Sequence, residues 1–467
     1  MPSTIRRTLV TSLILLAGGC INVKDLEYVP DDVDSQHLES DVAADIQPDS
    51  TRDGSSNPSD TIAETPDTSV DAAEDISTPA DSISCEVTGP ERCDGVDNDC
   101  DGETDEIPFK AKSVSVDGGH SCAIAEGGGL YCWGDNSYGK LGLGDKKARR
   151  TPRRVGGQKT FLEVSIASVF SCAIDSQRDT FCWGNDSNGS LGNGKPKKEK
   201  TSPTPVDFGM HLVDGEDIYT SYRVACLTST SGKLYCWGPN LRNLDNTGGV
   251  KENLLKAQII SDGVQYRSMA IGRSFGCGVD GTGTVYCWGD NGTGQLGLGV
   301  MNGNAVTNPS KIDSTKSFSM VSAATYHACG LTNDGDVYCW GANGAGQLGD
   351  GSTKFRVSPV RVQSNAQFTS VDSAGDYNCA LDSNGIAYCW GANDVGQLGI
   401  GKSGLPEKTP VAVDRNTRFQ EIAVGPQHAC GIRQNGTIVC WGRGKEGQLG
   451  INDLKNVPTP TPVTCAE

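Results

Sequence analysis

The segment GGHSCAIAEGGGLYCWGDNSYGKLGLG, residues 118–144, decides the fold, because the C-terminal three quarters of the chain repeat its pattern. All seven tryptophans stand in the tripeptide Cys-Trp-Gly, and consecutive tryptophans are 50 to 54 residues apart. They are Trp133, Trp183, Trp237, Trp288, Trp340, Trp390 and Trp441. A fixed period of this length indicates a repeat architecture and must be recognised before single elements are assigned.

Each unit contains short alternating strands separated by Asp, Asn and Gly turns, as in HSCAI-AEGGG-LYCWG, which is typical of a β-hairpin. A second cysteine stands ten residues before the cysteine of every Cys-Trp-Gly. In a hairpin centred on the turn, residues ten apart can face one another with Cα atoms about 4.5–5.5 Å apart, which a disulfide accepts. We therefore predict seven hairpin disulfides: Cys122–Cys132, Cys172–Cys182, Cys226–Cys236, Cys277–Cys287, Cys329–Cys339, Cys379–Cys389 and Cys430–Cys440.

A glycine-rich stretch follows the tryptophan in six units, for example WGDNGTGQLGLG at 288–299. A phosphate-binding glycine loop occurs once, between a strand and a helix, with its lysine. Six copies without that context predict structural turns instead. The third unit departs from the pattern with WGPNLRNLDNTGGVKENLL, so this unit is either irregular or carries a specific surface.

These motifs, in units of about 51 residues from 111 to 464, resemble regulator of chromosome condensation repeats. The resemblance implies an all-β fold, a seven-bladed β-propeller, which we assign to residues 109–467. The paired cysteines distinguish this chain from the intracellular members of the family and indicate a secreted version, because disulfides persist in oxidising compartments.

The N-terminus has the pattern of an export signal. Arg6 and Arg7 precede an apolar run from Leu9 to Ala17, which is too short to span a bilayer. The run ends at LAGGC and resembles a bacterial lipoprotein signal, which would make Cys20 the lipidated first residue after removal of the rest of segment 1–20. The alternative is an ordinary cleaved signal with an incidental cysteine. The resemblance predicts an extracytoplasmic protein anchored to a bacterial membrane, with the outer membrane or cell surface favoured.

Residues 21–84 hold 17 acidic and 2 basic residues and almost no large apolar side chains. Such a composition predicts a disordered, extended acidic linker. Segments 21–84 and 85–110 carry −15 and −7, and residues 1–20 carry +2, so residues 111–467 contribute +2 to the formal net charge of −18. A nearly neutral propeller gives no electrostatic case for nucleic acid or an anionic bilayer as its target.

Residues 85–108 contain an acidic cysteine motif. Asp97, Asp99 and Asp101 alternate before Gly102, as in the first half of an EF-hand-like calcium loop, and Asp105 or Glu106 could complete the ligand set. The segment resembles the MopE-type metal-binding motif. Hard oxygen ligands favour structural calcium. The alternatives are another metal, or a solvated acidic loop closed by a disulfide.

Cysteine parity supports the pairing scheme. If Cys20 is lipidated, 18 of the 19 cysteines remain, and 14 of these belong to the hairpins. The four left over allow three pairings. We favour Cys93–Cys100 together with Cys85–Cys465, because the second bond would join the two ends of a closed ring.

The sequence favours binding over catalysis. His120, His327 and His428 share one repeat position, which separates them in space, and no serine motif or recurrent acid pair accompanies them. A structural hydrogen bond at the blade edge is the expected role for each. We predict a monomeric, non-catalytic module for a protein or cell-surface ligand. The alternatives are guanine-nucleotide exchange, implied by the family resemblance, and a polysaccharide-binding or polysaccharide-degrading enzyme.

Overall fold

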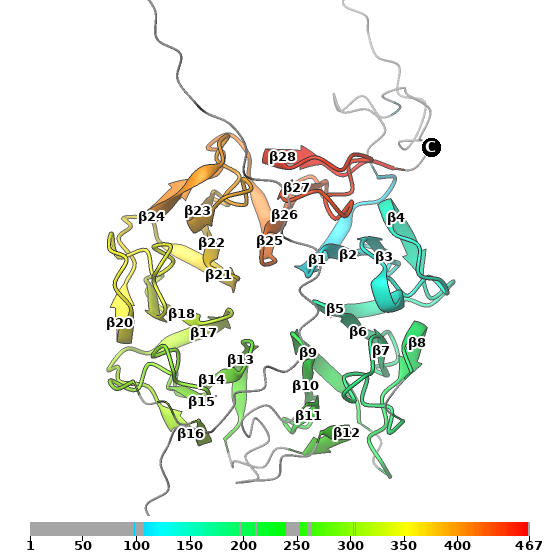
Figure 1. Cartoon of the computed structure of the whole chain (residues 1–467), viewed down its shortest axis with the longest axis horizontal. Coiled ribbons are helices and arrows are strands. Elements are labelled where there is room, and N and C mark those ends of the chain that lie inside the picture. The colour runs from blue at the N-terminus through cyan, green and yellow to red at the C-terminus, as the bar shows by residue number, and fades with distance from the viewer. Residues whose placement is uncertain are drawn as a thin grey trace, which may run out of the picture. The chain divides into compact units, whose positions relative to one another are not determined.

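The computed structural model describes residues 98, 107–195, 198–210, 213–239, 253–259, 264–301, 303 and 305–465. The described strands form seven four-stranded antiparallel sheets. Seen in Figure 1, the sheets surround a centre, with the first strand of each blade innermost and the fourth outermost. The all-β, seven-bladed propeller predicted from the repeats is therefore confirmed.

Each blade consists of four strands that are consecutive in the chain. Blade 1 has β1 (Ala111–Asp117), β2 (His120–Ala125), β3 (Leu130–Gly134) and β4 (Arg149–Val155), with a short 3-10 helix η1 (Ser137–Gly139). Blade 2 has β5 (Phe161–Ala167), β6 (Phe170–Asp175), β7 (Thr180–Gly184) and β8 (Lys200–Pro205). Blade 3 has β9 (Gly215–Ser221), β10 (Val224–Ser229), β11 (Leu234–Gly238) and β12 (Leu254–Ile259). Blade 4 has β13 (Tyr266–Ile271), β14 (Phe275–Asp280), β15 (Val285–Gly289) and β16 (Val306–Lys311). Blade 5 has β17 (Phe318–Ala323), β18 (His327–Thr332), β19 (Val337–Gly341) and β20 (Arg356–Arg361). Blade 6 has β21 (Phe368–Ala374), β22 (Tyr377–Asp382), β23 (Ala387–Asn393) and β24 (Gly404–Ala412). Blade 7 has β25 (Phe419–Val424), β26 (His428–Arg433), β27 (Ile438–Gly442) and β28 (Val457–Pro462).

The second and third strands of every blade form the predicted hairpin. Cys122 lies directly opposite Cys132, and the other six pairs have the same register. A disulfide joins each pair, with Cα atoms 4.0–4.1 Å apart, slightly closer than opposed strand residues usually lie. All seven hairpin disulfides are confirmed.

The apolar core lies between the blades. One cluster combines Ile124 and Leu130 of blade 1 with Phe161 and Trp183 of blade 2. The same arrangement closes the ring, where Trp133 of blade 1 packs with residues of blade 7. Each blade therefore buries its apolar surface only with its neighbours present, as in other repeat folds.

The fold has two faces with different loops. Because the strands of a blade are antiparallel, the loops from the first to the second strand and from the third to the fourth lie on one face, which we call the loop face. The hairpin turns between the second and third strands, and the connections between blades, lie on the opposite face, which we call the turn face.

Candidate functional site

The three histidines at the equivalent repeat position are buried at blade junctions. His120 Nε2 lies 3.0 Å from Ser171 Oγ, and Ser121 Oγ lies 3.0 Å from His428 Nε2. His327 Nε2 is 2.8 Å from Asn378 Oδ1 of the next blade. The predicted structural hydrogen bonds at the blade edge are present.

Burial keeps these histidines neutral. It lowers the pKa of His428 to about 4 and also lowers the pKa values of His120 and His327. A buried imidazole whose pKa lies below its ordinary value stays neutral at pH 7, which makes it a poor candidate for taking up a proton from a ligand.

The glycine-rich stretches link consecutive blades. Trp183 Nε1 of blade 2 donates a 2.9 Å hydrogen bond to Lys140 O, in the KLG turn of blade 1. Five other tryptophans make the equivalent bond, including Trp133 to Gln448 O across the junction of blades 7 and 1. The prediction that these stretches are structural turns is confirmed.

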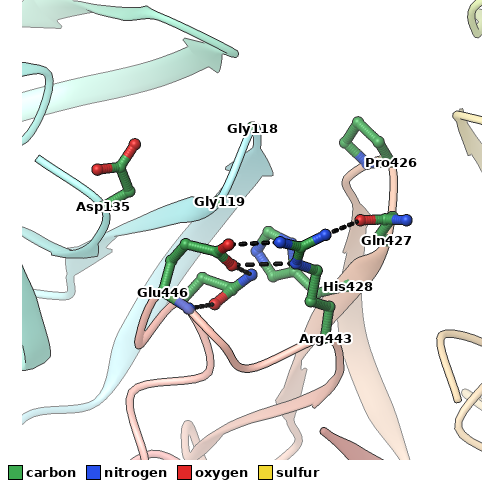
Figure 2. Close-up of a pocket in the computed structure, with 9 residues that line it drawn as sticks. Gly118, Gly119, Asp135, Pro426, Gln427, His428, Arg443 and Glu446 are labelled. Atoms are coloured by element: carbon green, nitrogen blue, oxygen red, sulfur yellow. Dashed lines mark hydrogen bonds and ion pairs between the residues drawn. The ribbon is translucent and has the colours of Figure 1, made fainter. Parts of the chain in front are cut away.

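A polar pocket lies at the junction of blades 7 and 1 on the loop face (Figure 2). It has a volume of about 240 Å³ and is lined by Gly118, Gly119, Asp135, Pro426, Gln427, His428, Arg443, Glu446 and Gln448. Figure 2 shows Arg443 between Gln427 and Glu446. The guanidinium donates to Gln427 Oε1 at 2.8 Å and to Glu446 Oε1 at 2.5 Å.

The charges of this pocket are paired. Burial alone would raise the pKa of Glu446, but the bonds from Arg443 and Gln448 outweigh it and lower that pKa. Burial would raise the pKa of Asp135, but the charge of the Lys140 ammonium, 2.8 Å away, and the hydrogen bonds from Lys140 and Ser137 together lower it. Two ionised, paired carboxylates suit hydrogen bonding to a polar ligand better than proton transfer.

A second cavity of about 460 Å³ repeats this position between blades 5 and 6. It is lined by Gln347, Asp376, Asp394 and Pro406, among others, and Gln347 Nε2 donates to Asp376 Oδ1 at 3.0 Å. Gln347 and Gln448 share one repeat position, as do Asp376 and Gln427. The junction pocket is thus a property of the repeat, with lining side chains that differ from blade to blade.

The innermost strands β5, β9, β21 and β25 carry partly buried carboxyl groups, namely Glu163, Asp217, Asp372 and Glu421. Glu163 accepts the N–H of Ile218 at 3.1 Å, and Glu421 accepts that of Val114 at 3.1 Å, each from the next blade. Burial raises the pKa of Glu163 to about 8, with a further increase from the charge of Asp217. Burial also raises the pKa of Glu421 to about 7 and that of Asp372 to about 6. Glu163, Asp372 and Glu421 each satisfy a backbone donor of the neighbouring blade, which is a structural role.

The predicted metal and lipidation sites lie outside the described residues. They are Cys20, Asp97, Asp99, Asp101, Asp105 and Glu106, together with Cys85, Cys93 and Cys100. Cys465 is described and is disulfide-bonded. Every other described cysteine is paired within its hairpin, so the partner of Cys465 lies beyond the described part and Cys85 stays a prediction.

The described residues contain neither a cluster of metal-binding side chains nor a membrane-spanning helix. No group of three or more His, Cys, Asp or Glu side chains there could hold a metal ion. No helix in the same part of the chain is long and apolar enough to cross a membrane.

The junction pocket was not foreseen from the sequence. Its lining joins Gly118 and Asp135 of the first repeat to Gln427 and Glu446 of the last, more than 290 positions apart. Aligning the seven repeats could have indicated it, because blade 7 has polar Gln427 before the histidine position and Glu446 two residues before Gln448.

The fold is a closed propeller that has a disulfide within each blade and polar pockets at blade junctions. Models of the regulator of chromosome condensation (RCC1) repeat match residues 127–174, 282–331, 334–381 and 384–432, and a second model of that repeat matches 112–140, 266–295 and 419–448. The chain belongs to this repeat family.

Known proteins with the repeat are similar over most of the propeller. The ultraviolet-B receptor UVR8 of Arabidopsis thaliana is 27% identical over 353 residues, which cover 74% of this chain and 80% of the receptor. The human E3 ubiquitin-protein ligase HERC2 is 27% identical over 251 residues, 52% of this chain but only 5% of the ligase.

Solved structures share the fold. Yeast RCC1 (Prp20), crystallised bound to Kap60, superimposes with a TM-score of 0.63 at 21% identity and covers 71% of this chain and 83% of its own. Human WBSCR16 gives a TM-score of 0.64 at 18% identity, over 72% of this chain and 94% of its own. At these identities the likeness shows the fold alone.

Proposed function

We propose that this protein is a non-catalytic binding module, held outside the cytoplasm by a lipid at Cys20, whose propeller captures a protein or another cell-surface ligand. The observation that carries the proposal is a contrast between polar residues that bond between blades and polar residues that line pockets at the loop face. His120, His327 and the innermost carboxyl groups of Glu163, Asp372 and Glu421 bond between blades, whereas the junction pockets present paired polar groups at the loop face. A rigid ring with varied loops is suited to recognition.

The relatives support a binding role by analogy. Prp20 of Saccharomyces cerevisiae has been studied for its binding to Gsp1p and histones, and it shares the propeller at 20% identity. A shared fold does not transfer a partner. The partner of this chain is therefore expected in the compartment to which its signal directs it, the bacterial envelope.

The test is an affinity capture from envelope extract with the full chain as bait. We expect a stable partner, and we expect the double variant Gln427→Ala/Arg443→Ala to retain it at least ~10-fold less well if the pocket of Figure 2 is the site. Lys233→Ala, exposed on the turn face, is the matched control and should retain the partner fully. No capture by the wild type, or equal loss with Lys233→Ala, would contradict the proposal.

We also propose that Asp97, Asp99 and Asp101, with Asp105 or Glu106, hold structural calcium. Alternating carboxylates before a glycine support this assignment. Titration calorimetry of the full chain should detect one calcium site that is lost in Asp97→Asn/Asp99→Asn. Equal heats for the wild type and this variant would reject the site.

A further inference from the structure

Half of the exposed large apolar side chains in the described part of the chain lie on one equivalent loop in blades 4 to 7. Val300 and Met301 in blade 4, Phe355 in blade 5, Leu405 in blade 6 and Leu454 in blade 7 are 56%, 51%, 55%, 83% and 39% exposed. All lie 12 to 15 residues after the blade's tryptophan, where the chain enters the outermost strand. We call these segments the rim tips.

The rim tips of blades 1 and 2 are basic instead. Lys146 and Lys147 stand at the equivalent place in blade 1, and Lys198 stands there in blade 2. The loop-face end of the outermost strand of blade 1 adds exposed Arg150, whereas Arg153 and Arg154 lie toward the turn face, opposite Cys132 and Tyr131. Each of the other six outermost strands has at most two basic residues.

Most of this basic charge is free to act outside the molecule. Lys146 pairs with Glu199, but within the described residues Lys147, Lys198 and Arg150 form no ion pair. The net charge of about +2 on residues 111–467 therefore conceals a local excess of positive charge on blades 1 and 2. The net charge of residues 111–467 predicted no electrostatic attraction of the propeller to an anionic surface. The local excess of basic residues corrects that prediction.

The rim tips are held by equivalent backbone contacts between neighbouring blades on the loop face. Gly144 N donates to Thr201 O, at the start of the next blade's outermost strand, at 2.8 Å. Gly299, Gly351 and Gly401 make the same contact with their next blades. Each tip is thus held by an equivalent contact at the edge of the ring. Figure 1 shows the outermost strands β16, β20 and β24 on the periphery.

This arrangement indicates the kind of partner. The apolar tips belong to four separate blades and do not form one continuous patch, whereas protein partners bury a contiguous core of apolar residues. A flat surface can contact all of a ring of equivalent tips at once. Apolar side chains beside lysine and arginine are the combination that binds the interface of an anionic membrane.

We propose that the loop face docks directly on an anionic lipid bilayer, with the apolar rim tips of blades 4–7 in the interface and the basic rim tips of blades 1 and 2 on lipid phosphates. This goes beyond the proposed capture of a partner and does not depend on it. A loop face at the membrane would meet partners that lie in or on that membrane, so the junction pocket keeps its proposed use.

The test uses the full chain with Cys20→Ser, which removes the proposed lipidation site, and vesicles of phosphatidylcholine with or without phosphatidylglycerol. We expect sedimentation with the vesicles that contain phosphatidylglycerol and weaker binding as salt is raised. Phe355→Ser/Leu405→Ser and Lys146→Glu/Lys147→Glu should each weaken binding by about tenfold. The acidic segment 21–84 is common to all variants, so its repulsion of the vesicles cancels in these comparisons.

The matched controls lie on the turn face. Met210→Ser removes a fully exposed apolar side chain, and Lys233→Glu reverses an exposed charge there. Both should bind as the parent does, and all variants should keep its melting temperature. The proposal is overturned if the parent does not bind, if the controls weaken binding equally, or if only the lysine variant matters and a soluble polyanion competes fully. The last result would assign the surface to a polyanion.

Discussion

At the scale of single residues, a glycine in each glycine-rich stretch leaves room for the indole of the next blade. An ideal Cβ on Gly399 would lie 2.7 Å from Trp441 Nε1, and the φ of Gly399 is +70°. Gly399→Ala should therefore lower the free energy of unfolding by ~1–3 kcal/mol through overpacking, beyond the backbone strain. Chemical denaturation measures this loss.

Gly401→Ala is the control for that substitution. Gly401 has a similar φ of +80°, but nothing lies within 4 Å of its ideal Cβ. Both variants carry the backbone cost of a side chain in the left-handed region, so their difference isolates the contact with Trp441. Equal destabilisation of the two would show that the indole contact is unimportant.

Glu163 gives stability a defined pH dependence. Its pKa rises from 4.5 to about 8 in the folded state, so the folded protein holds this proton more tightly than the unfolded chain does. The stabilisation is fully present below about pH 4.5 and is lost as the pH rises through 8. Glu163→Gln cannot ionise and keeps an oxygen for the N–H of Ile218.

The stability of Glu163→Gln should increase relative to that of the wild type as the pH rises. At pH 5 the wild type still benefits from its protonated carboxyl group, whereas at pH 8 Glu163→Gln should be more stable than the wild type by at least ~1 kcal/mol. Thermal melts of both proteins at pH 5 and pH 8 measure the change. A difference that is the same at both pH values would mean that Glu163 is ionised throughout.

Residue-scale inference from the sequence succeeded where contacts are local. The pairing of Cys122 with Cys132 follows from a spacing of ten within one hairpin. The bond from Trp183 to Lys140 O joins residues 43 positions apart in different blades, and no pattern in one repeat specifies it. The structural role of the histidines was predicted from their recurrence, but the expectation that recurrence separates them in space is wrong for one pair. His428 Nε2 lies 3.0 Å from Ser121 Oγ, and the pKa of His120, which burial lowers most, is lowered further by the charge of His428.

At the scale of elements, each blade is a hairpin with a disulfide flanked by two further strands. Replacing the blade 5 pair by Cys329→Ala/Cys339→Ala should destabilise the protein by ~3 kcal/mol, because a closed loop of this length removes about that much chain entropy from the unfolded state. Denaturant titration of the oxidised proteins measures the loss. A change below ~1 kcal/mol would show that the disulfides add little to packing that is already complete.

The repeat period could predict the strands of each blade but not how blades meet. The alternation in HACGL-TNDGD-VYCWG marks β18 and β19 directly. The carboxylate of Glu421 accepting the N–H of Val114 depends on which blade follows which in space, and this pair lies 307 residues apart. The basic and apolar rim tips were missed for another reason, since a charge summed over 111–467 averages them away.

At the scale of the whole molecule, the ring closes by side-chain contact and not by a shared strand. All seven described sheets take their four strands from one repeat, so no described strand of blade 7 comes from the N-terminal part of the chain. Blades 7 and 1 meet through β1, β25 and β26 and through the pocket of Figure 2. A covalent bond between the ends would hold this junction against separation.

The predicted bond is Cys85–Cys465, and Cys465 is disulfide-bonded. Non-reducing peptide mapping should recover Cys465 linked to Cys85, and a link from Cys465 to Cys93 or Cys100 would contradict the assignment. If the link is Cys85, then Cys85→Ser/Cys465→Ser should lower the free energy of unfolding by up to ~5 kcal/mol, since the bond closes a very long loop. The blade 5 variant, Cys329→Ala/Cys339→Ala, is the comparison. A bond across the ring junction should cost more to remove than one within a hairpin, because separation of blades 7 and 1 exposes the apolar cluster around Trp133 before any blade unfolds.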